Sequence, residues 1–284
     1  MTSVGKWVAG ARPRTLVAAI APVMVATAFA GSQWSPWRAL LALIVSLALQ
    51  IGVNYANDYS DGIRGTDDSR IGPIRLTASG LAKPGAVKAA AAISFLVAAL
   101  AGLALASITT WWLILVGALA LNAAWGYTGG NNPYGYKGLG EVAVFLFFGV
   151  VATVGSYFVQ TEKMNLQVFI ISIPMGALAC AILAINNLRD REQDEIVGKK
   201  TVAVRLGDKG ARGLYIALLL SAHLFALLTF EPSALLTLLA APLTWNLARG
   251  VISGVQGAEL IPYLAKTGKL QLAFALLFAL GLII

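Results

Sequence analysis

Long apolar stretches alternate with short polar connectors along the 284 residues of the chain. A helix that crosses a membrane needs about 20 mainly apolar residues to cover roughly 30 Å of hydrocarbon. Stretches of that length predict nine membrane-spanning helices and an all-α membrane protein in which residues 1–284 form a single integral-membrane domain. The expected helices cover 15–31, 38–57, 86–108, 110–127, 139–160, 166–187, 210–229, 233–253 and 268–284.

The composition lies outside the range of soluble domains. Hydrophobic residues make up 58% of the chain, charged residues only 12%, and the mean hydropathy is +0.77. Soluble domains carry about 25% charged residues. Because nearly every residue falls in an expected helix or a short connector, the chain has no room for a separate soluble domain.

Lysine and arginine are concentrated in alternate connectors, and this pattern predicts the orientation of the helices. Cytoplasmic connectors retain positive charge. With the N-terminus inside, all of the 21 Lys and Arg residues except Arg38 and Lys163 are cytoplasmic. The net charge of +8 is then a topology signal combined with attraction to anionic lipid or substrate, and it does not indicate nucleic-acid binding. We expect a multi-pass protein of the plasma membrane with its active-site loops in the cytoplasm.

Acidic residues gather on the same side, with only Glu162 and Glu231 of the 13 on the other. NYANDYSDGIRGTDDSR (54–70) begins at the end of the second expected helix, and NNLRDREQDEIVGKK (186–200) at the end of the sixth. Side chains three, four or seven positions apart share one face of a helix. Each cluster therefore presents a strip of oxygen ligands, and two such strips four helices apart predict a duplicated bundle in which both face one cavity. The strips are Asn54, Asn57, Asp58 and Asp61, and Asn187, Asp190 and Asp194.

Carboxylates at a membrane boundary require a cationic partner. An aspartate at the bilayer centre costs about 2.5 to 3.5 kcal/mol on insertion scales, less near the interface, and converging like charges repel. Oxygen ligands without a supporting histidine or cysteine suit a hard ion such as Mg²⁺. Mg²⁺ is commonly held by one or two carboxylates together with substrate phosphate oxygens, so the two strips are what a Mg²⁺-bridged diphosphate would require.

Basic residues follow both strips and are suited to neutralise phosphate oxygens that the metal leaves uncovered. The alternative for any single one is that it only balances the acids of a positive cytoplasmic connector. The residues are Arg64, Arg70 and Arg75 after the first strip and Lys199 and Lys200 after the second.

A third polar stretch, YTGGNNPYGYKGLGE (127–141), joins the fourth and fifth expected helices. Its glycines permit close backbone approach, while Tyr134, Tyr136 and Lys137 are suited to an aromatic or anionic group. The stretch follows no strand and matches no nucleotide-binding fingerprint. An ordinary turn is the other interpretation.

These motifs resemble those of the UbiA-type intramembrane prenyltransferases. NDYSD (57–61) is similar to the first N-D-x-x-D motif of that family and DREQD (190–194) to its second D-x-x-x-D motif, on helices 2 and 6 of a nine-helix fold. The similarity covers essentially the whole chain, although NN (131–132) stands where a proline-containing pair is expected. Further segments most resemble the menaquinone-pathway branch, which prenylates 1,4-dihydroxy-2-naphthoate: ARPRTL (11–16), GTDD (65–68), GPIRLTASG (72–80), YTGG with YGYKGLGE (127–130, 134–141) and GKKTVAVRLG (198–207).

The resemblance implies transfer of a polyprenyl group from polyprenyl diphosphate to this aromatic acid, with loss of CO₂, to give demethylmenaquinone. It implies a central cavity with cap loops after helices 2 and 6, and Mg²⁺ as cofactor. The expected partners are the two substrates and the lipid bilayer, with no nucleic acid and no obligatory protein partner. The implied Mg²⁺ ligands are Asn57, Asp58, Asp61, Asp190 and Asp194, of which the four aspartates are catalytic. The candidate diphosphate-binding residues are Asn54, Arg64, Arg70, Arg75, Asn187, Lys199 and Lys200, and the candidate acceptor-binding residues are Arg14, Tyr136 and Lys137.

Other interpretations stay open. DYSDG (58–62) resembles the start of the CDP-alcohol phosphatidyltransferase motif, but the expected continuation is missing. An ion-coupled transporter also uses paired intramembrane acids, although usually near mid-bilayer on interrupted helices. Within the UbiA-type family, a 4-hydroxybenzoate, homogentisate, haem or phosphoribose acceptor would use the same metal chemistry.

Overall fold

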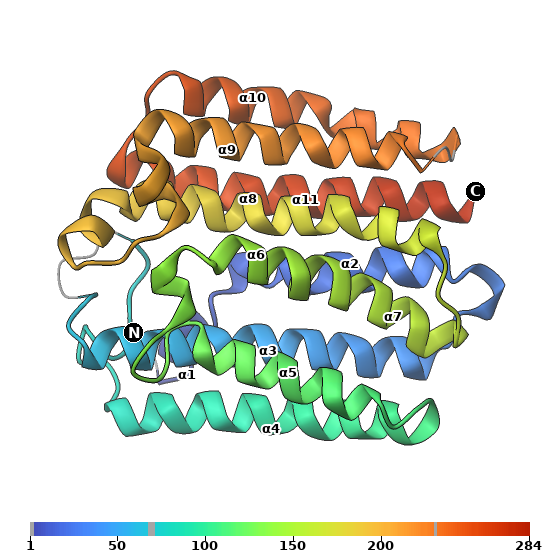
Figure 1. Ribbon diagram of the computed structural model, residues 1–284, viewed down its shortest axis with the longest axis horizontal. Coiled ribbons are helices and arrows are strands. Elements are labelled where there is room, and N and C mark those ends of the chain that lie inside the picture. Colours follow the sequence, from blue (N-terminus) through green and yellow to red (C-terminus); the bar gives the residue numbers. More distant parts are fainter. Residues whose placement is uncertain (1–2, 68–71, 230–231) are drawn as a thin grey trace.

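Helices form all the regular structure of the computed structural model within the residues it describes, which are 3–67, 72–229 and 232–284. Figure 1 shows the long helices lying side by side, so that the chain runs back and forth between two ends of the molecule. The all-α prediction is confirmed for these ranges.

The first part of the chain contains two long helices, one shorter helix and a bent N-terminal pair. Its elements are α1 (Ser3–Ala11), η1 (Pro13–Thr15), α2 (Val17–Phe29), η2 (Gly31–Gln33), α3 (Pro36–Ile63), α4 (Pro84–Ile108) and α5 (Leu113–Gly126).

The second part begins with a short connector helix and continues with longer helices. Its elements are η3 (Tyr134–Lys137), α6 (Gly140–Val144), the π-helical η4 (Phe145–Val151), α7 (Ala152–Thr161), α8 (Leu166–Ile196), α9 (Val202–Leu227), η5 (Pro232–Ala240), α10 (Ala241–Ile252), η6 (Gly257–Leu260) and α11 (Ile261–Ile283).

The number of membrane spans differs from the expected nine. Among the described residues, seven helices or continuous helix runs are long and apolar enough to cross a membrane. The pair Ser3–Thr15 and Val17–Phe29, bent by 53°, raises the number to eight if it is one span. The helix at Leu113–Gly126 has 14 residues, fewer than a straight crossing needs. The chain is therefore a multi-pass membrane protein, but nine spans are not confirmed.

Two helices extend past the apolar stretches that predicted them. α3 continues from residue 57 to Ile63, and α8 continues from residue 187 to Ile196. An apolar scan stops at the first cluster of charges, whereas the backbone hydrogen bonds of a helix do not depend on side-chain polarity. Both aspartate strips thus lie on helices and keep the spacing expected of one helix face.

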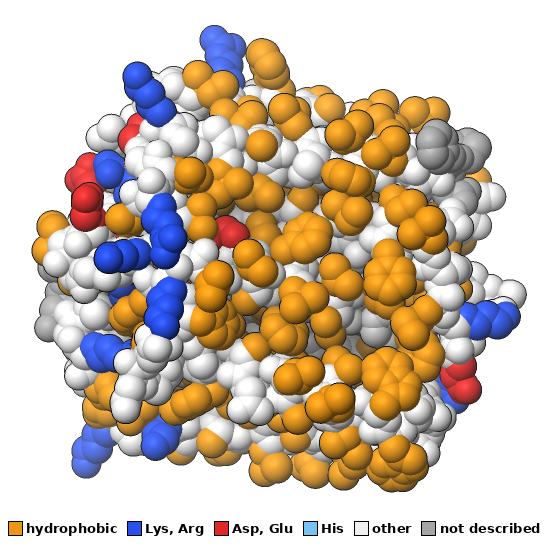
Figure 2. Space-filling view, viewed as in Figure 1, with side chains coloured by type: hydrophobic (Ala, Val, Ile, Leu, Met, Phe, Trp, Pro, Cys, Tyr) orange, Lys and Arg blue, Asp and Glu red, His pale blue; other side chains and the backbone are white. Residues whose placement is uncertain are grey.

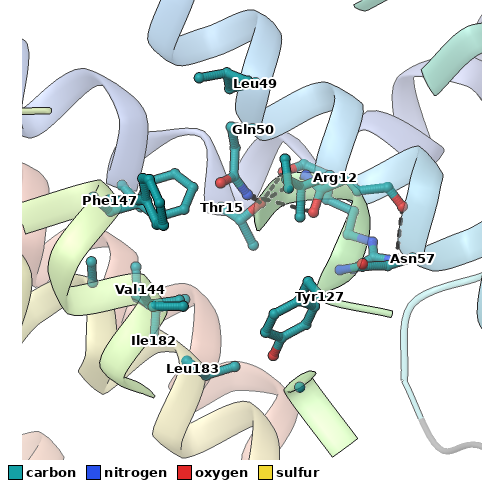
Figure 3. A pocket seen from close by; sticks show the side chains of 18 of the residues that line it. Arg12, Thr15, Leu49, Gln50, Asn57, Tyr127, Val144, Phe147, Ile182 and Leu183 are labelled. Atoms are coloured by element: carbon teal, nitrogen blue, oxygen red, sulfur yellow. Dashed lines mark hydrogen bonds between the residues drawn. The ribbon is translucent and has the colours of Figure 1, made fainter. Parts of the chain in front are cut away.

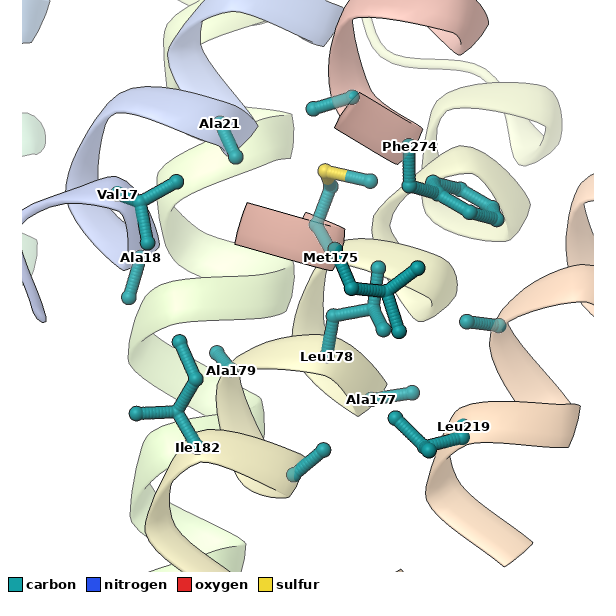
Figure 4. Packing of buried hydrophobic residues seen from close by; sticks show 14 of the residues in the cluster. Val17, Ala18, Ala21, Met175, Ala177, Leu178, Ala179, Ile182, Leu219 and Phe274 are labelled. Carbon is teal, nitrogen blue, oxygen red and sulfur yellow. The ribbon is translucent and has the colours of Figure 1, made fainter. Parts of the chain in front are cut away.

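α8 is the central helix of the bundle. In its most apolar window 78% of the residues are buried, a larger share than in any other candidate span among the described residues. Figure 4 shows Met175 and Leu178 of α8 between α2 and α11, with Leu219 of α9 on another side. Because α8 is enclosed by its neighbours, the polar end of α8 faces protein as well.

The charged residues lie mainly at one end of the molecule. Figure 2 shows Lys and Arg side chains gathered at one end of the visible face, with hydrophobic side chains over most of the rest. At the other end, Arg38 forms a salt bridge with Glu162 (2.8 Å) and donates to the backbone carbonyl of Ile108 (3.0 Å). The molecule thus has a charged end, an apolar surface along its length and a small polar group at the other end. This distribution is typical of a protein that crosses a bilayer.

Candidate active site

A cavity of about 760 Å³ lies inside the bundle, next to the charged end. Figure 3 shows Thr15, Gln50 and Asn57 near Arg12, with Phe147 and other apolar side chains on a separate side. The apolar wall includes Leu49, Val144, Phe147, Ile182 and Leu183. A cavity with one polar and one apolar part can hold a molecule that has an ionic head and a hydrocarbon tail.

The two oxygen strips line this same cavity, from opposite helices. The end of α3 contributes Asn54, Asn57 and Asp61, and the end of α8 contributes Asn187, Asp190 and Asp194. The sequence predicts that the strips converge on one space, and the lining residues agree with that prediction. These six side chains supply oxygen donors only through carboxylate and amide groups.

Asp61 is the one acid of α3 that lines the cavity. Its Oδ1 accepts a hydrogen bond from the Tyr136 hydroxyl (2.6 Å), and its Oδ2 accepts one from Lys199 Nζ (3.3 Å). Lys199 comes from the connector after α8, so this ion pair joins the first polar motif to the second. Lys199 Nζ also lies 4.6 Å from the centre of the Tyr136 ring, within cation–π range. The three groups form a small charged and aromatic cluster on the cavity wall.

Asp58 faces a different direction from Asp61. It is fully buried and is not among the residues that line the cavity. Its Oδ2 accepts from the backbone N–H of Leu76 (2.8 Å), and its Oδ1 accepts from that of Thr77 (2.9 Å). The structure therefore separates Asp58 from the other predicted ligands, because both of its oxygens hold the connector that follows α3.

The α8 aspartates are accompanied by an arginine that the sequence interpretation did not select. Asp190 accepts two hydrogen bonds from Arg189, both 2.7 Å long, and this arginine also donates to Asn186 (2.8 Å). Such a bidentate pair fixes the carboxylate plane. Gly72 lies directly against the guanidinium, since a Cβ at position 72 would be 3.2 Å from Arg189 Cζ. The signal that was available is the arginine directly before the motif DREQD (190–194).

The predicted diphosphate-binding cations have different positions. Arg75 and Lys199 line the cavity, and Arg75 pairs with Asp67 at 3.2 Å. Arg64 is not among the lining residues and donates to the backbone carbonyls of Thr128 and Gly130. Lys200 is exposed and likewise absent from the lining.

One predicted cation, Arg70, lies outside the described residues. The positions of Arg64 and Lys200 suit the alternative interpretation, in which a basic residue holds a connector or faces solvent. Of the predicted diphosphate-binding cations within the described residues, Arg75 and Lys199 are thus the two that line the cavity.

The predicted acceptor-binding residues are also divided. Tyr136 and Arg14 line the cavity, whereas Lys137 is exposed and is not part of the lining. Burial and the negative charge of Asp61 raise the pKa of Tyr136 above its ordinary value, and burial raises the pKa of Tyr134 to about 12. Both phenols keep their protons at neutral pH, so Tyr136 acts as a hydrogen-bond donor to Asp61.

Sequence reasoning missed several polar side chains of the cavity wall. Gln50 and Asn54 donate to the Thr15 hydroxyl at 3.1 and 3.2 Å, and Arg12 donates to the backbone carbonyl of Asn54 at 3.4 Å. Thr128 donates to Asn57 Oδ1 at 2.7 Å. Gln50 precedes Asn54 by four positions and so extends the first strip by one helical turn, a signal that was present in the sequence.

The oxygen ligands that the protein supplies fit Mg²⁺ only when a substrate diphosphate supplies further oxygen ligands. Among the described residues no group of three His, Cys, Asp or Glu side chains lies close enough to hold a metal alone. The cavity instead offers carboxylate and amide oxygens on two opposite helices. Mg²⁺ keeps several waters and is usually bound by one or two carboxylates plus substrate phosphates. The arrangement therefore fits an ion that arrives with a diphosphate rather than a permanent protein cage.

Comparisons with known proteins identify the class to which this fold and site belong. The model of the UbiA prenyltransferase family matches residues 19–257. The chain belongs to the UbiA prenyltransferase family. A solved structure described as a UbiA homolog from Archaeoglobus fulgidus bound to DMAPP and Mg²⁺ has the same fold, with a TM-score of 0.71 at 16% identity over 98% of this chain and 99% of that one.

Relatives within the family are similar over nearly their whole length. A 1,4-dihydroxy-2-naphthoate octaprenyltransferase of Mycobacterium tuberculosis is 50% identical, over 98% of this chain and 97% of the relative. An enzyme of the same name from Escherichia coli is 40% identical, over 97% and 94%. The resemblance that the polar motifs predicted is thus confirmed at the level of the family.

Proposed function

We infer that this chain is a prenyltransferase that transfers a polyprenyl group from polyprenyl diphosphate to 1,4-dihydroxy-2-naphthoate, with decarboxylation, in menaquinone biosynthesis. The single observation that carries the inference is the cavity whose polar part is lined by Asp61 on α3 and by Asp190 and Asp194 on α8. Similarity to naphthoate octaprenyltransferases at 32–50% identity supports the acceptor.

The polar part of the cavity is proposed to bind the diphosphate. Arg75 and Lys199 lie on its wall and are suited to pair with phosphate oxygens. Mg²⁺, when bound, would stabilise the charge on the departing diphosphate. The residues proposed to hold the ion are Asn57, Asp61, Asn187, Asp190 and Asp194.

The apolar part is proposed to hold the prenyl chain and to keep water from the reacting carbon. The allylic C–O bond breaks with its electron pair leaving on the diphosphate, and the electron-rich ring supplies the pair for the new C–C bond. Loss of CO₂ from the same ring carbon returns an electron pair to the ring. An allylic cation reacts with water readily, so side chains such as Phe147 and Ile182 protect it by exclusion. Tyr136 and Arg14 are proposed to orient the acceptor.

Asp58 is proposed to act on the position of the connector after α3 rather than directly on the metal. Asp58 accepts hydrogen bonds from the backbone N–H groups of residues 76 and 77, which directly follow Arg75 in the sequence. These hydrogen bonds hold the connector that carries this cavity-lining arginine. Asp58 in this proposal is a positioning residue.

The whole chain is proposed to be one domain of the plasma membrane, with the N-terminus and the connectors after α3 and α8 in the cytoplasm. The distribution of Lys and Arg supports this orientation, since only Arg38 and Lys163 lie on the other side. Polyprenyl diphosphate reaches the site from the membrane and the aromatic acid from the cytoplasm.

The test is a reaction of the purified protein with Mg²⁺, a polyprenyl diphosphate and a panel of aromatic acids, with products identified by mass. We expect a product from 1,4-dihydroxy-2-naphthoate that has gained the prenyl group and lost CO₂. Faster reaction with 4-hydroxybenzoate or homogentisate would contradict the acceptor and leave the reaction class intact. Movement of a solute across vesicles without consumption of any prenyl diphosphate would contradict the reaction class.

A further inference from the structure

A basic groove lies outside the central cavity, where the start of α2 meets the first turns of α11, and it shares Arg14 and Ile261 with the cavity wall. Its volume is about 590 Å³, and its polar side chains are Arg14, Lys266 and Lys269. The other described residues of its lining are apolar or glycine, and no acid is among them. Three positive charges and no negative one give this groove a positive potential that attracts anions.

Close packing between the two segments forms the groove. A Cβ at Gly268 would lie 3.0 Å from the carbonyl oxygen of Arg14 and 3.4 Å from Val17 Cγ1, so a larger residue would push α11 away. This contact places Arg14 beside Lys269, which is the next residue after Gly268. Two chain segments far apart in the sequence are thereby held with their positive charges on one surface.

The three cations are exposed and are not neutralised within the protein. None of them forms a salt bridge with a carboxylate of the described chain. Lys266 has an aromatic neighbour, with its Nζ 5.2 Å from the centre of the Tyr263 ring. Like charges held together repel, and an external anion relieves that repulsion.

An apolar surface continues from the groove along α11. Leu272 belongs to the groove lining and is 39% exposed, while Leu276 and Leu280 follow at four-residue intervals and are 52% and 50% exposed. Lys269 lies three positions before Leu272, so all four residues share one face of the helix. At about 1.5 Å per residue this leucine stripe is roughly 12 Å long, comparable to the thickness of one hydrocarbon leaflet.

We propose that this groove binds the headgroup of an anionic phospholipid, with one acyl chain lying along the leucine stripe of α11. Lys and Arg side chains extend their charged ends to the headgroup layer while their stems stay in apolar surroundings, which matches the lining of the groove. A free anion such as inorganic phosphate would use the three cations but not the stripe. The combination of both features identifies a lipid as the ligand.

The lipid has a structural consequence for the enzyme. Arg14 and Ile261 line both the groove and the central cavity. A bound headgroup therefore fixes the junction of η1 and α11 from the outside while the other face of the junction forms the cavity wall. The lipid site does not depend on the identity of the aromatic acceptor.

The test measures phospholipid binding to the full-length protein by native mass spectrometry, with phosphatidylglycerol compared with phosphatidylcholine. The test variant is Lys266→Gln with Lys269→Gln. The matched control, Lys83→Gln with Lys209→Gln, removes the same charge from two exposed lysines that do not line the groove. A basic residue near an anionic lipid surface contributes about fivefold in affinity, so we expect about thirtyfold weaker phosphatidylglycerol binding in the test variant and little change in the control.

Three outcomes would overturn the proposal. Equal binding of phosphatidylcholine and phosphatidylglycerol would exclude headgroup recognition, and an equal loss in the control pair would show that only overall charge matters. Binding of inorganic phosphate or of the aromatic acid at the two lysines, without lipid, would reassign the groove to a soluble anion. Should the glutamine pair fail to fold, a Lys266→Arg with Lys269→Arg variant keeps both charges and must prefer phosphatidylglycerol over phosphatidylcholine as the wild-type protein does. In the wild-type protein, about 1 M salt must weaken this preference.

Discussion

At the scale of single residues, the structure assigns different environments to two aspartates on the same helix face. Asp58 and Asp61 are three positions apart, and both follow the spacing that predicted an oxygen strip. Asp61 lines the cavity, whereas Asp58 accepts two backbone hydrogen bonds from the connector after α3. A substitution of Asp61 is therefore expected to affect catalysis, and a substitution of Asp58 is expected to affect stability.

Asp61→Asn is expected to lower prenyl transfer by about a hundredfold or more, because it removes a carboxylate that is proposed to hold the Mg²⁺ that would stabilise the leaving diphosphate. The measurement is product formation at varied Mg²⁺, and the Mg²⁺ concentration needed for half-maximal rate should rise. Glu192→Gln is the control, since this exposed acid lies near Asp190 on α8 but does not line the cavity. A normal rate for Asp61→Asn, or an equal loss for Glu192→Gln, would remove Asp61 from the proposed metal site.

Asp58→Asn is expected to destabilise the connector more than it changes the Mg²⁺ response. An asparagine has one acceptor oxygen where two backbone N–H groups need partners, and a hydrogen bond to a charged group contributes about 1.5 to 3 kcal/mol. We expect a lower melting temperature and faster protease cleavage between residues 63 and 84. Unchanged stability together with a raised Mg²⁺ requirement would make Asp58 a metal ligand instead.

At the scale of elements, a tight contact between η4 and α8 depends on glycine. A Cβ at Gly149, in the π-helical η4, would lie 2.5 Å from the Cα of Gly176 in α8. The absence of both side chains lets these backbones approach each other. The same region of η4 carries Phe147 into the cavity, so helix packing and the shape of the apolar wall are linked.

Gly149→Ala is therefore expected to destabilise the protein by about 1 to 3 kcal/mol, as overpacking of a tight contact does. Gly155→Ala in α7 is the matched control, because its Cβ would meet no atom within 4 Å and alanine favours a helix. Thermal melting in detergent measures both. Equal melting temperatures for the two variants would show that η4 can move away from α8 without cost.

At the scale of the whole molecule, charge separates the two ends of the bundle. The end near the aspartate strips carries most of the Lys and Arg, while the opposite end has the Arg38–Glu162 pair. The cavity has a polar part next to the charged end and an apolar part beyond it, so its shape suits the proposed substrate, which has an ionic head and a hydrocarbon tail. The basic groove on α11 lies beside this arrangement and adds a surface for membrane lipid.

The proposed orientation predicts which introduced cysteines are reached from each side. Lys163→Cys is expected to react with a membrane-impermeant thiol reagent in intact cells, and Lys209→Cys only in inverted vesicles. Both lysines are exposed, and the native Cys180 is buried and should contribute little background. The reverse labelling pattern would place the active site outside the cytoplasm.

Much of the fold and part of the site follow from local sequence patterns. The apolar stretches locate the long helices, and four-residue spacing places Asn57 and Asp61 on one face of α3. The extent of α3 and α8 was underestimated, since a hydropathy scan cannot follow a helix into charged residues. The bent α1–η1–α2 entry was not predicted, because the left-handed backbone at Arg12 (φ 53°) depends on contacts with residues distant in the sequence.

The sequence by itself determined that this is an integral membrane protein and that most of its acidic residues lie at helix ends. It also determined that their oxygen ligands suit a diphosphate with Mg²⁺. These conclusions follow from composition and from helix periodicity, which act over a few turns. Only the tertiary structure decided that Asp61 lines the cavity while Asp58 holds a connector, and that Lys199 meets Asp61 across the bundle. Such partners are far apart along the chain, and packing of whole helices brings them together.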